Sequence, residues 1–190
     1  GVNHVTCFAM EVRDGTLTSL PDCVRPTVAL LCQQFLHLQA QIARLDKLIF
    51  AASRQDKRVR LLQTIPGVGP ITASAIVATI GEPQRFRSGR DFAAWIGLTP
   101  LNKSSGGKER LGRITKMGDR YLRRLLVSGM TARIGHARRQ PDCVDPWVIR
   151  LLGRKPTRLA TIAMANKTAR IIWAVLTRQK PYQAPQFAAA

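Results

Sequence analysis

The chain has 190 residues, of which 45% are hydrophobic and 6% aromatic, and its formal net charge is +19. This length suits one domain with an appendage or two small domains, and the low aromatic content disfavours a sheet that stacks single-stranded bases. The four cysteines form no CxxC pair and the three histidines have no second ligand near them in sequence, so we expect reduced thiols and no metal site in this chain.

The positive charge is concentrated in the C-terminal two thirds of the chain. Residues 1–53 have a net charge of zero, residues 54–100 of +4 and residues 101–180 of +15. Such a field favours a polyanionic partner. A membrane surface is also anionic, but we find no lipidation signal, no basic helix with bulky apolar anchors and no apolar run approaching the ~18 residues of a membrane helix. Nucleic acid is therefore the predicted partner, and no membrane association is expected.

Residues 1–26 have only a weak pattern, with turn signals at Asp14-Gly15 and Pro21-Asp22. We expect this segment to be a weakly ordered N-terminal remnant. The first residue is Gly rather than Met, which is consistent with a piece of a longer protein.

A long helix is predicted over residues 27–58. Apolar residues alternate there at steps of three and four, filling the a and d positions of four heptads: Val28, Leu31, Phe35, Leu38, Ile42, Leu45, Ile49 and Ala52. This pattern is typical of a coiled coil, and we expect residues 28–52 to join copies of the chain into a homo-oligomer. The alternatives are a hairpin coiled coil within the chain and a globular helix that packs one face on its own domain.

Residues 61–81 predict two helices joined by a glycine turn. The turn contains Gly67, Val68 and Gly69, and its glycines allow positive φ and close approach of a second backbone. Outward N–H groups of such a turn, with the positive end of the following helix, form a phosphate site. This is helix-hairpin-helix chemistry, which binds a DNA backbone without reading bases. An ordinary pair of antiparallel helices is the alternative.

The remaining segments predict further helices separated by basic loops. A loop with three arginines precedes a short helix near residues 91–97, which Ser88 or Asp91 would cap, and residues 98–113 read as a loop with short extended pieces. Helices follow from Asp119 and over residues 157–178, whereas residues 141–156 read as irregular and residues 181–190 as a disordered tail. The predicted fold class is therefore all-α. The loop arginines that we expect on phosphates are Arg85, Arg87 and Arg90.

Five motifs in order resemble the C-terminal half of transposases of the insertion-sequence-110 family, also called the 110/116/902 family. They are TIPGVGP at 64–70, FRSGRDFAAWIGL at 86–98, SSGG at 104–107, LGRITKMGDRYLRRLL at 111–126 and NKTARIIW at 166–173. The resemblance covers about residues 60–180, and the heptad segment matches the coiled coil that this family places between its two domains. We therefore expect a helix-hairpin-helix transposase domain over residues 59–180.

The resemblance implies an RNA-guided DNA transposase that cuts and rejoins strands through a phosphoserine intermediate. The nucleophile would be Ser104, with Ser105 as the second choice, because a serine Oγ conserves the energy of the phosphodiester bond. Its implied partners are DNA and a structured guide RNA, in the bacterial or archaeal cytoplasm at the nucleoid. Further residues expected to contact nucleic acid are Lys103, Gly106, Gly107, Lys108, Arg110, Arg113, Lys116, Arg120, Arg123 and Arg124.

One departure from the family is large. The family's N-terminal domain, which carries a cluster of acidic metal ligands, has no counterpart here, because residues 1–26 contain only Glu11, Asp14 and Asp22 as acids. The resemblance therefore implies that Mg²⁺ belongs to the complete enzyme and that this chain alone cuts nothing. The competing interpretations are a non-catalytic helix-hairpin-helix module and a scaffold that binds guide RNA.

Overall fold

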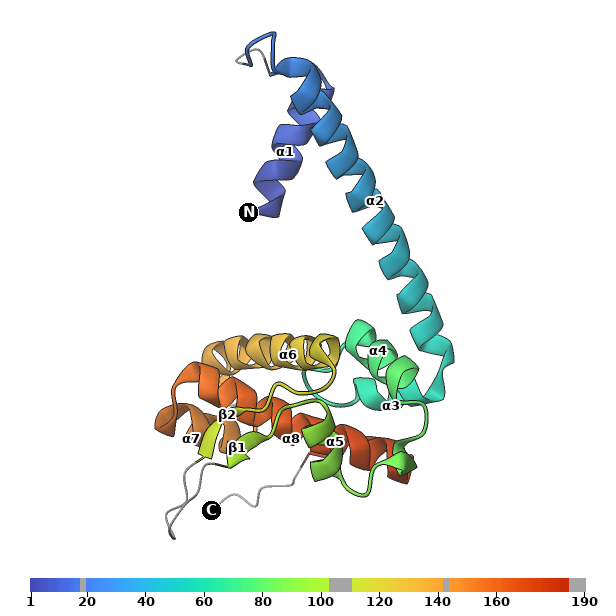
Figure 1. Cartoon of the computed structure of the whole chain (residues 1–190), viewed down its shortest axis with the longest axis vertical. Coiled ribbons are helices and arrows are strands. Elements are labelled where there is room, and N and C mark those ends of the chain that lie inside the picture. Colours follow the sequence, from blue (N-terminus) through green and yellow to red (C-terminus); the bar gives the residue numbers. More distant parts are fainter. Residues whose placement is uncertain (18–19, 103–110, 142–143, 185–190) are drawn as a thin grey trace. The chain divides into compact units, whose positions relative to one another are not determined.

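The structure is a computed structural model that describes residues 1–17, 20–102, 111–141 and 144–184. These residues are predominantly helical, with one short two-stranded sheet (Figure 1). The predicted all-α class is confirmed. The chain divides into two compact units, residues 1–51 and 52–190.

The first unit consists of α1 (Val2–Arg13) and most of α2 (Arg25–Gln55). The two helices are joined by the side chains of Thr6 and Gln39, whose amide nitrogen donates to the threonine hydroxyl at 3.0 Å. Small side chains, Ala9 on α1 and Cys32 on α2, are buried. Weak order was expected over residues 1–26, but the structure has a helix over much of this segment because α2 offers it a surface to pack on.

The predicted long helix is present but its bounds differ from 27–58. It ends at Gln55 because the Asp56 carboxylate accepts from the N–H groups of Arg58 and Val59, at 2.7 and 3.4 Å. This N-cap starts a new helix, α3 (Lys57–Gln63).

The second unit surrounds the helix α8 (Thr157–Arg178), which contacts α3, α5 (Gly89–Trp95), α6 (Arg120–Arg139), α7 (Pro146–Arg154) and the 3₁₀ turn η1 (Pro83–Arg85) (Figure 1). Nine residues of α8 are buried, Ile172 and Met164 among them. The helix is long and apolar enough to cross a membrane by length and composition, with a mean hydropathy of 1.2, but half of that window is buried inside the unit. This is the ordinary position of a core helix.

Side-chain caps fix the starts of two further helices. The Ser88 hydroxyl accepts from the Asp91 N–H at 3.2 Å and starts α5, while the Asp91 carboxylate accepts from the Arg87 N–H at 3.2 Å. The Asp119 carboxylate accepts from the Leu122 N–H at 2.8 Å and starts α6. Of the two caps predicted for the short helix α5, Ser88 is thus confirmed. The helix α4 (Pro70–Ile80) begins instead with proline at its first position.

One segment differs from expectation, and the short extended pieces expected in a second segment are present. Residues 146–154 form α7 where an irregular segment was predicted, because Asp145 caps the Trp147 N–H at 2.8 Å and Pro146 takes the first helical position. Within the predicted loop 98–113, β1 (Pro100–Asn102) and β2 (Leu111–Ile114) pair antiparallel, with Asn102 opposite Leu111.

Candidate nucleic-acid interface

The predicted phosphate-binding turn joins α3 to α4 and packs on α6. Gly67 has φ +86°, and a Cβ at this position would lie 3.1 Å from the carbonyl oxygen of Gly129. Gly69 has φ −84° and open space around its missing Cβ. The first glycine is therefore needed for packing, whereas the second leaves room for an external group.

The middle residue of this turn belongs to the core. The side chain of Val68 is 4% exposed, and its N–H donates to the carbonyl of Ile65 at 3.0 Å. In the part of the chain that the structure describes, α4 has no side-chain cap, which leaves its first-turn N–H groups available to an acceptor from outside.

A hollow of about 400 Å³ lies beside the turn. Arg133 and His136 of α6 line it together with Pro66, Gly67 and Gly129. We did not predict these two side chains from the sequence, because the apolar stripe of α6 alone does not reveal that the turn packs next to them. The hollow places one guanidinium and one imidazole beside the glycine turn.

The basic loop is anchored by aromatic rings. Phe86 is 7% exposed and packs against Phe92 and Trp95 with ring centroids 5.1 and 5.3 Å apart. The backbone of the loop is therefore fixed. Its predicted phosphate contacts are exposed: Arg85, Arg87 and Arg90.

The serine-containing segment joins β1 to β2. Its predicted residues lie outside the described residues: Lys103, Ser104, Ser105, Gly106, Gly107, Lys108 and Arg110. The base of the strand pair is held by three hydrogen bonds: the Thr115 N–H to Thr99 at 2.9 Å, the Lys116 N–H to Gly97 at 3.2 Å, and the Asn166 amide to the Leu98 carbonyl at 3.1 Å. The strand pair that supports the segment is therefore tied to α5 and α8.

The predicted cations of β2, of α6 and of the turn between them have two different environments. Arg123 is half-buried, and its Nη1 donates to the carbonyl of Ile96 at 2.7 Å. Arg113, Lys116, Arg120 and Arg124 are exposed. The fold therefore already uses the Arg123 guanidinium, whereas the exposed cations remain open to a ligand.

Little of this positive charge is neutralised within the second unit. Its described residues form two ion pairs, Arg58 with Asp56 at 3.7 Å and Lys167 with Asp145 at 3.6 Å. The described residues contain no group of three His, Cys, Asp or Glu side chains that could hold a metal ion. The unit is thus suited to binding an anion.

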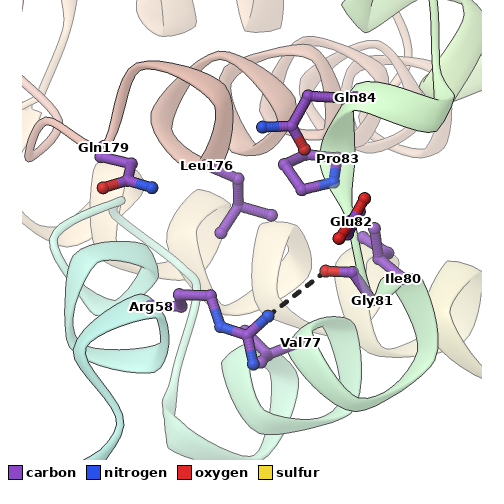
Figure 2. A pocket seen from close by; sticks show the side chains of 9 residues that line it. All are labelled: Arg58, Val77, Ile80, Gly81, Glu82, Pro83, Gln84, Leu176 and Gln179. Atoms are coloured by element: carbon purple, nitrogen blue, oxygen red, sulfur yellow. Dashed lines mark hydrogen bonds between the residues drawn. The ribbon is translucent and has the colours of Figure 1, made fainter.

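A pocket of about 270 Å³ opens between α3, α4, η1 and the end of α8 (Figure 2). The Arg58 guanidinium donates to the carbonyl of Gly81 at 3.3 Å and so ties the start of α3 to the end of α4. Glu82 also lines the pocket, which makes this face less suited to phosphate than the basic loop and α6.

Residues 59–143 match the sequence model of a family described as "Transposase IS116/IS110/IS902 family". The chain is 46% identical over 146 residues to "Probable family 20 transposase" of Pseudomonas aeruginosa, a match that covers 77% of this chain and 43% of that protein.

Two further relatives are transposases of named insertion elements. The chain is 37% identical to the IS1111A transposase of Coxiella burnetii, over 80% of this chain and 42% of that protein. It is 36% identical to the IS1328 transposase of Yersinia enterocolitica, over 84% of this chain and 48% of that protein. The chain thus spans less than half the length of these curated relatives.

Proposed function

We propose a function from the premise that this chain belongs through residues 59–143 to the IS116/IS110/IS902 transposase family. The proposed function is that of the nucleic-acid-binding and serine-nucleophile part of a DNA transposase. The observation that carries this proposal is the support of the serine-containing segment, which is tied to α5 and α8 and bordered by exposed cations. DNA is the proposed substrate, and a structured guide RNA is the proposed second ligand.

The proposed reaction conserves the energy of the broken phosphodiester bond in a covalent bond between protein and DNA. The Oγ of Ser104 loses its proton and attacks the phosphorus of a phosphodiester. The new Oγ–P bond forms as the P–O bond to one deoxyribose breaks, and the released sugar oxygen takes up one proton, which balances the proton lost by the serine. A hydroxyl of a second strand then attacks the phosphoserine, which frees the serine and rejoins the DNA. The exposed cations Arg113 and Lys116 are the described groups best suited to stabilise the negative charge of the pentacovalent phosphate.

Mg²⁺ is the cofactor that the family resemblance implies for the whole enzyme. The described residues of this chain do not fit such a site, because they lack the required cluster of acidic side chains. We propose that the ligands belong to another part of the transposase and that this chain alone does not cut DNA.

The proposal includes assembly through α2. Four apolar side chains at a and d positions of its heptads are 56–64% exposed within this chain: Leu31, Leu38, Ile42 and Leu45. A seam of this kind is buried when two helices form a coiled coil. We propose a second copy of this chain as its occupant.

The test of catalysis uses the complete transposase with its guide RNA and Mg²⁺. Wild type is compared with Ser104→Ala and Ser105→Ala for strand exchange and for a covalent protein–DNA adduct. Loss of the adduct in Ser104→Ala alone supports the assignment, and loss in Ser105→Ala alone transfers the role to that serine. Adduct formation by both variants would favour the alternative of a non-catalytic module.

The alternatives of a DNA-binding module and a guide-RNA scaffold differ in ligand preference. Competition between duplex DNA and structured RNA for this chain separates them. For either ligand, neutralising about six to ten phosphates predicts a loss of ~10³–10⁵ in affinity between low and moderately high salt. A shallow salt dependence would contradict the electrostatic basis of the proposal.

A further inference from the structure

A basic groove, separate from the hollow beside the glycine turn, lies on the face of the unit formed by α5, α7 and α8. Its volume is about 900 Å³, at the upper end of ligand-binding clefts. The groove is lined by side chains from three separate parts of the sequence, among them Arg90, Trp147, Asn166, Lys167, Arg170 and Trp173. Only Arg90 of these was a predicted nucleic-acid contact.

Close backbone packing brings two cations to the same rim. Gly89 at the start of α5 lies against α8, and a Cβ at Gly89 would be 3.0 Å from the carbonyl oxygen of Arg170. Arg90, the next residue, and Arg170 both line the groove and both are exposed. The described part of the chain provides no carboxylate as an ion-pair partner for either guanidinium, so both are available to an external anion.

The third cation of the groove has a different role. The ammonium of Lys167 lies 3.8 Å from the centroid of the Trp147 ring and 3.6 Å from the Asp145 carboxylate. Asp145 also caps α7 at the Trp147 N–H. Lys167 is therefore partly neutralised, and its contact with the indole fixes the ring in the wall of the groove.

The wall and floor of the groove also provide apolar surface. Trp147, Ile171 and Trp173 line it and are half-buried. The indole N–H of Trp173 is used in a hydrogen bond to the Pro83 carbonyl at 3.1 Å, so this ring offers an apolar surface to the groove. A ligand that fits such a site has both an anionic part and a flat apolar part.

We infer that this groove binds unpaired nucleotides of a nucleic-acid strand, with backbone phosphate on Arg90 and Arg170 and a base against Trp147. The inference rests on the proposed function and extends it by naming a single-stranded subsite. Duplex DNA presents its bases stacked inside the helix, so only an unpaired segment delivers both phosphate and base to the groove. Asn166 lines this groove and also bonds the Leu98 carbonyl just before β1, so the subsite shares a residue with the support of the serine-containing segment.

Binding of a labelled short single strand to the 190-residue chain tests the phosphate contacts. The double variant Arg90→Gln/Arg170→Gln is compared with Arg158→Gln/Arg178→Gln, which removes the same charge from exposed positions of α8 outside the groove. We expect about a tenfold weaker binding and a salt slope reduced by about 1.4 for the groove variant only, since each phosphate of a single strand contributes about 0.7. Equal losses in both variants would overturn the inference.

Tryptophan fluorescence tests the base contact. We expect an intact strand to quench emission in wild type, a strand of the same length with abasic sites to quench it less, and Trp147→Phe to lose this difference. DNA and RNA strands of matched sequence show which sugar the groove prefers. Equal quenching by intact and abasic strands, or an unchanged difference in Trp147→Phe, would refute the base contact and leave an anion-binding surface that an acidic peptide also occupies.

Failure of the groove and failure of the proposed function give different results. If wild type binds neither duplex nor single-stranded nucleic acid, the proposed function is wrong. If wild type binds both and the groove variant binds single strands as tightly as wild type does, only the subsite is refuted. Thermal denaturation of every variant establishes that the protein tested is folded.

Discussion

Gly67, in the turn between α3 and α4, lies directly against Gly129 of α6, backbone to backbone. A Cβ on Gly129 would overlap the carbonyl oxygen of Gly67, and a Cβ on Gly67 would meet the Met130 side chain. The turn that the sequence marks for phosphate binding is therefore also a packing joint. Its position on α6 places the open side of the turn next to Arg133 and His136.

This joint predicts opposite effects for two glycines of the same helix. Gly129→Ala should lower the free energy of unfolding by about 2 kcal/mol, because a backbone oxygen blocks the new methyl group. Gly135→Ala, which meets nothing within 4 Å, should raise it by about 0.5–1 kcal/mol through helix propensity. Urea denaturation measures both, and a neutral Gly129→Ala would mean that α6 and the turn separate readily.

The two glycines of the turn should also respond differently. Gly67→Ala should destabilise the chain by at least ~1–2 kcal/mol, because φ is +86° there. Gly69→Ala should leave the melting temperature unchanged, because φ is −84° and the space is open. If a phosphate approaches this turn, Gly69→Ala should nevertheless weaken binding to duplex DNA. Wild-type affinity in a folded Gly69→Ala variant would remove the turn from the interface.

Local signals account for the parts of the fold that were predicted. The helix starts at Ser88 and Asp119 have a local cause, because each of these side chains accepts a hydrogen bond from the N–H group three residues later. The apolar period of α8 extends over its whole length. The same kind of signal, Asp145 followed by proline, was present before α7, but nine residues give too short a period to identify a helix unaided.

Long-range contacts account for the parts that were not predicted. The pairing of β1 with β2 depends on a support that includes Asn166 and Leu98, which are 68 positions apart. The groove depends on the approach of Gly89 to the backbone of Arg170. A local sequence pattern does not tell which arginine side chains such long-range contacts turn into the fold, as they do Arg123, and which stay exposed.

Arg123 and Arg124 should therefore differ although they are neighbours. Arg123→Met should destabilise the chain by about 1.5–3 kcal/mol, because it removes a charged donor from the Ile96 carbonyl. Arg124→Met should leave stability within about 0.5 kcal/mol of wild type and weaken nucleic-acid binding. Thermal denaturation together with binding at one salt concentration separates the two effects, and equal stability of both variants would show that the Ile96 bond contributes little.

Lys116 combines an exposed charge with a left-handed backbone, at φ +57°. Asparagine tolerates this conformation better than lysine, so Lys116→Asn should keep or slightly raise the melting temperature. The same change removes a cation at the base of the strand pair that supports the serine-containing segment, so it should weaken DNA binding. A folded variant that binds DNA as tightly as wild type does would exclude Lys116 from the interface, and a lower melting temperature would contradict the argument from its backbone conformation.

The exposed seam of α2 predicts self-association that depends on its apolar side chains. Leu38→Glu/Leu45→Glu places like charges at two d positions that are 56% and 57% exposed in this chain, and it should convert an oligomer into monomers because two facing helices cannot bury these carboxylates. The matched control, Gln33→Glu/Ala40→Glu, adds the same charge at exposed f positions of the same helix and should leave the oligomer intact. Sedimentation equilibrium measures the mass of each form. A monomeric wild type would eliminate the coiled coil, and an oligomer that persists in both variants would place the contact between copies elsewhere.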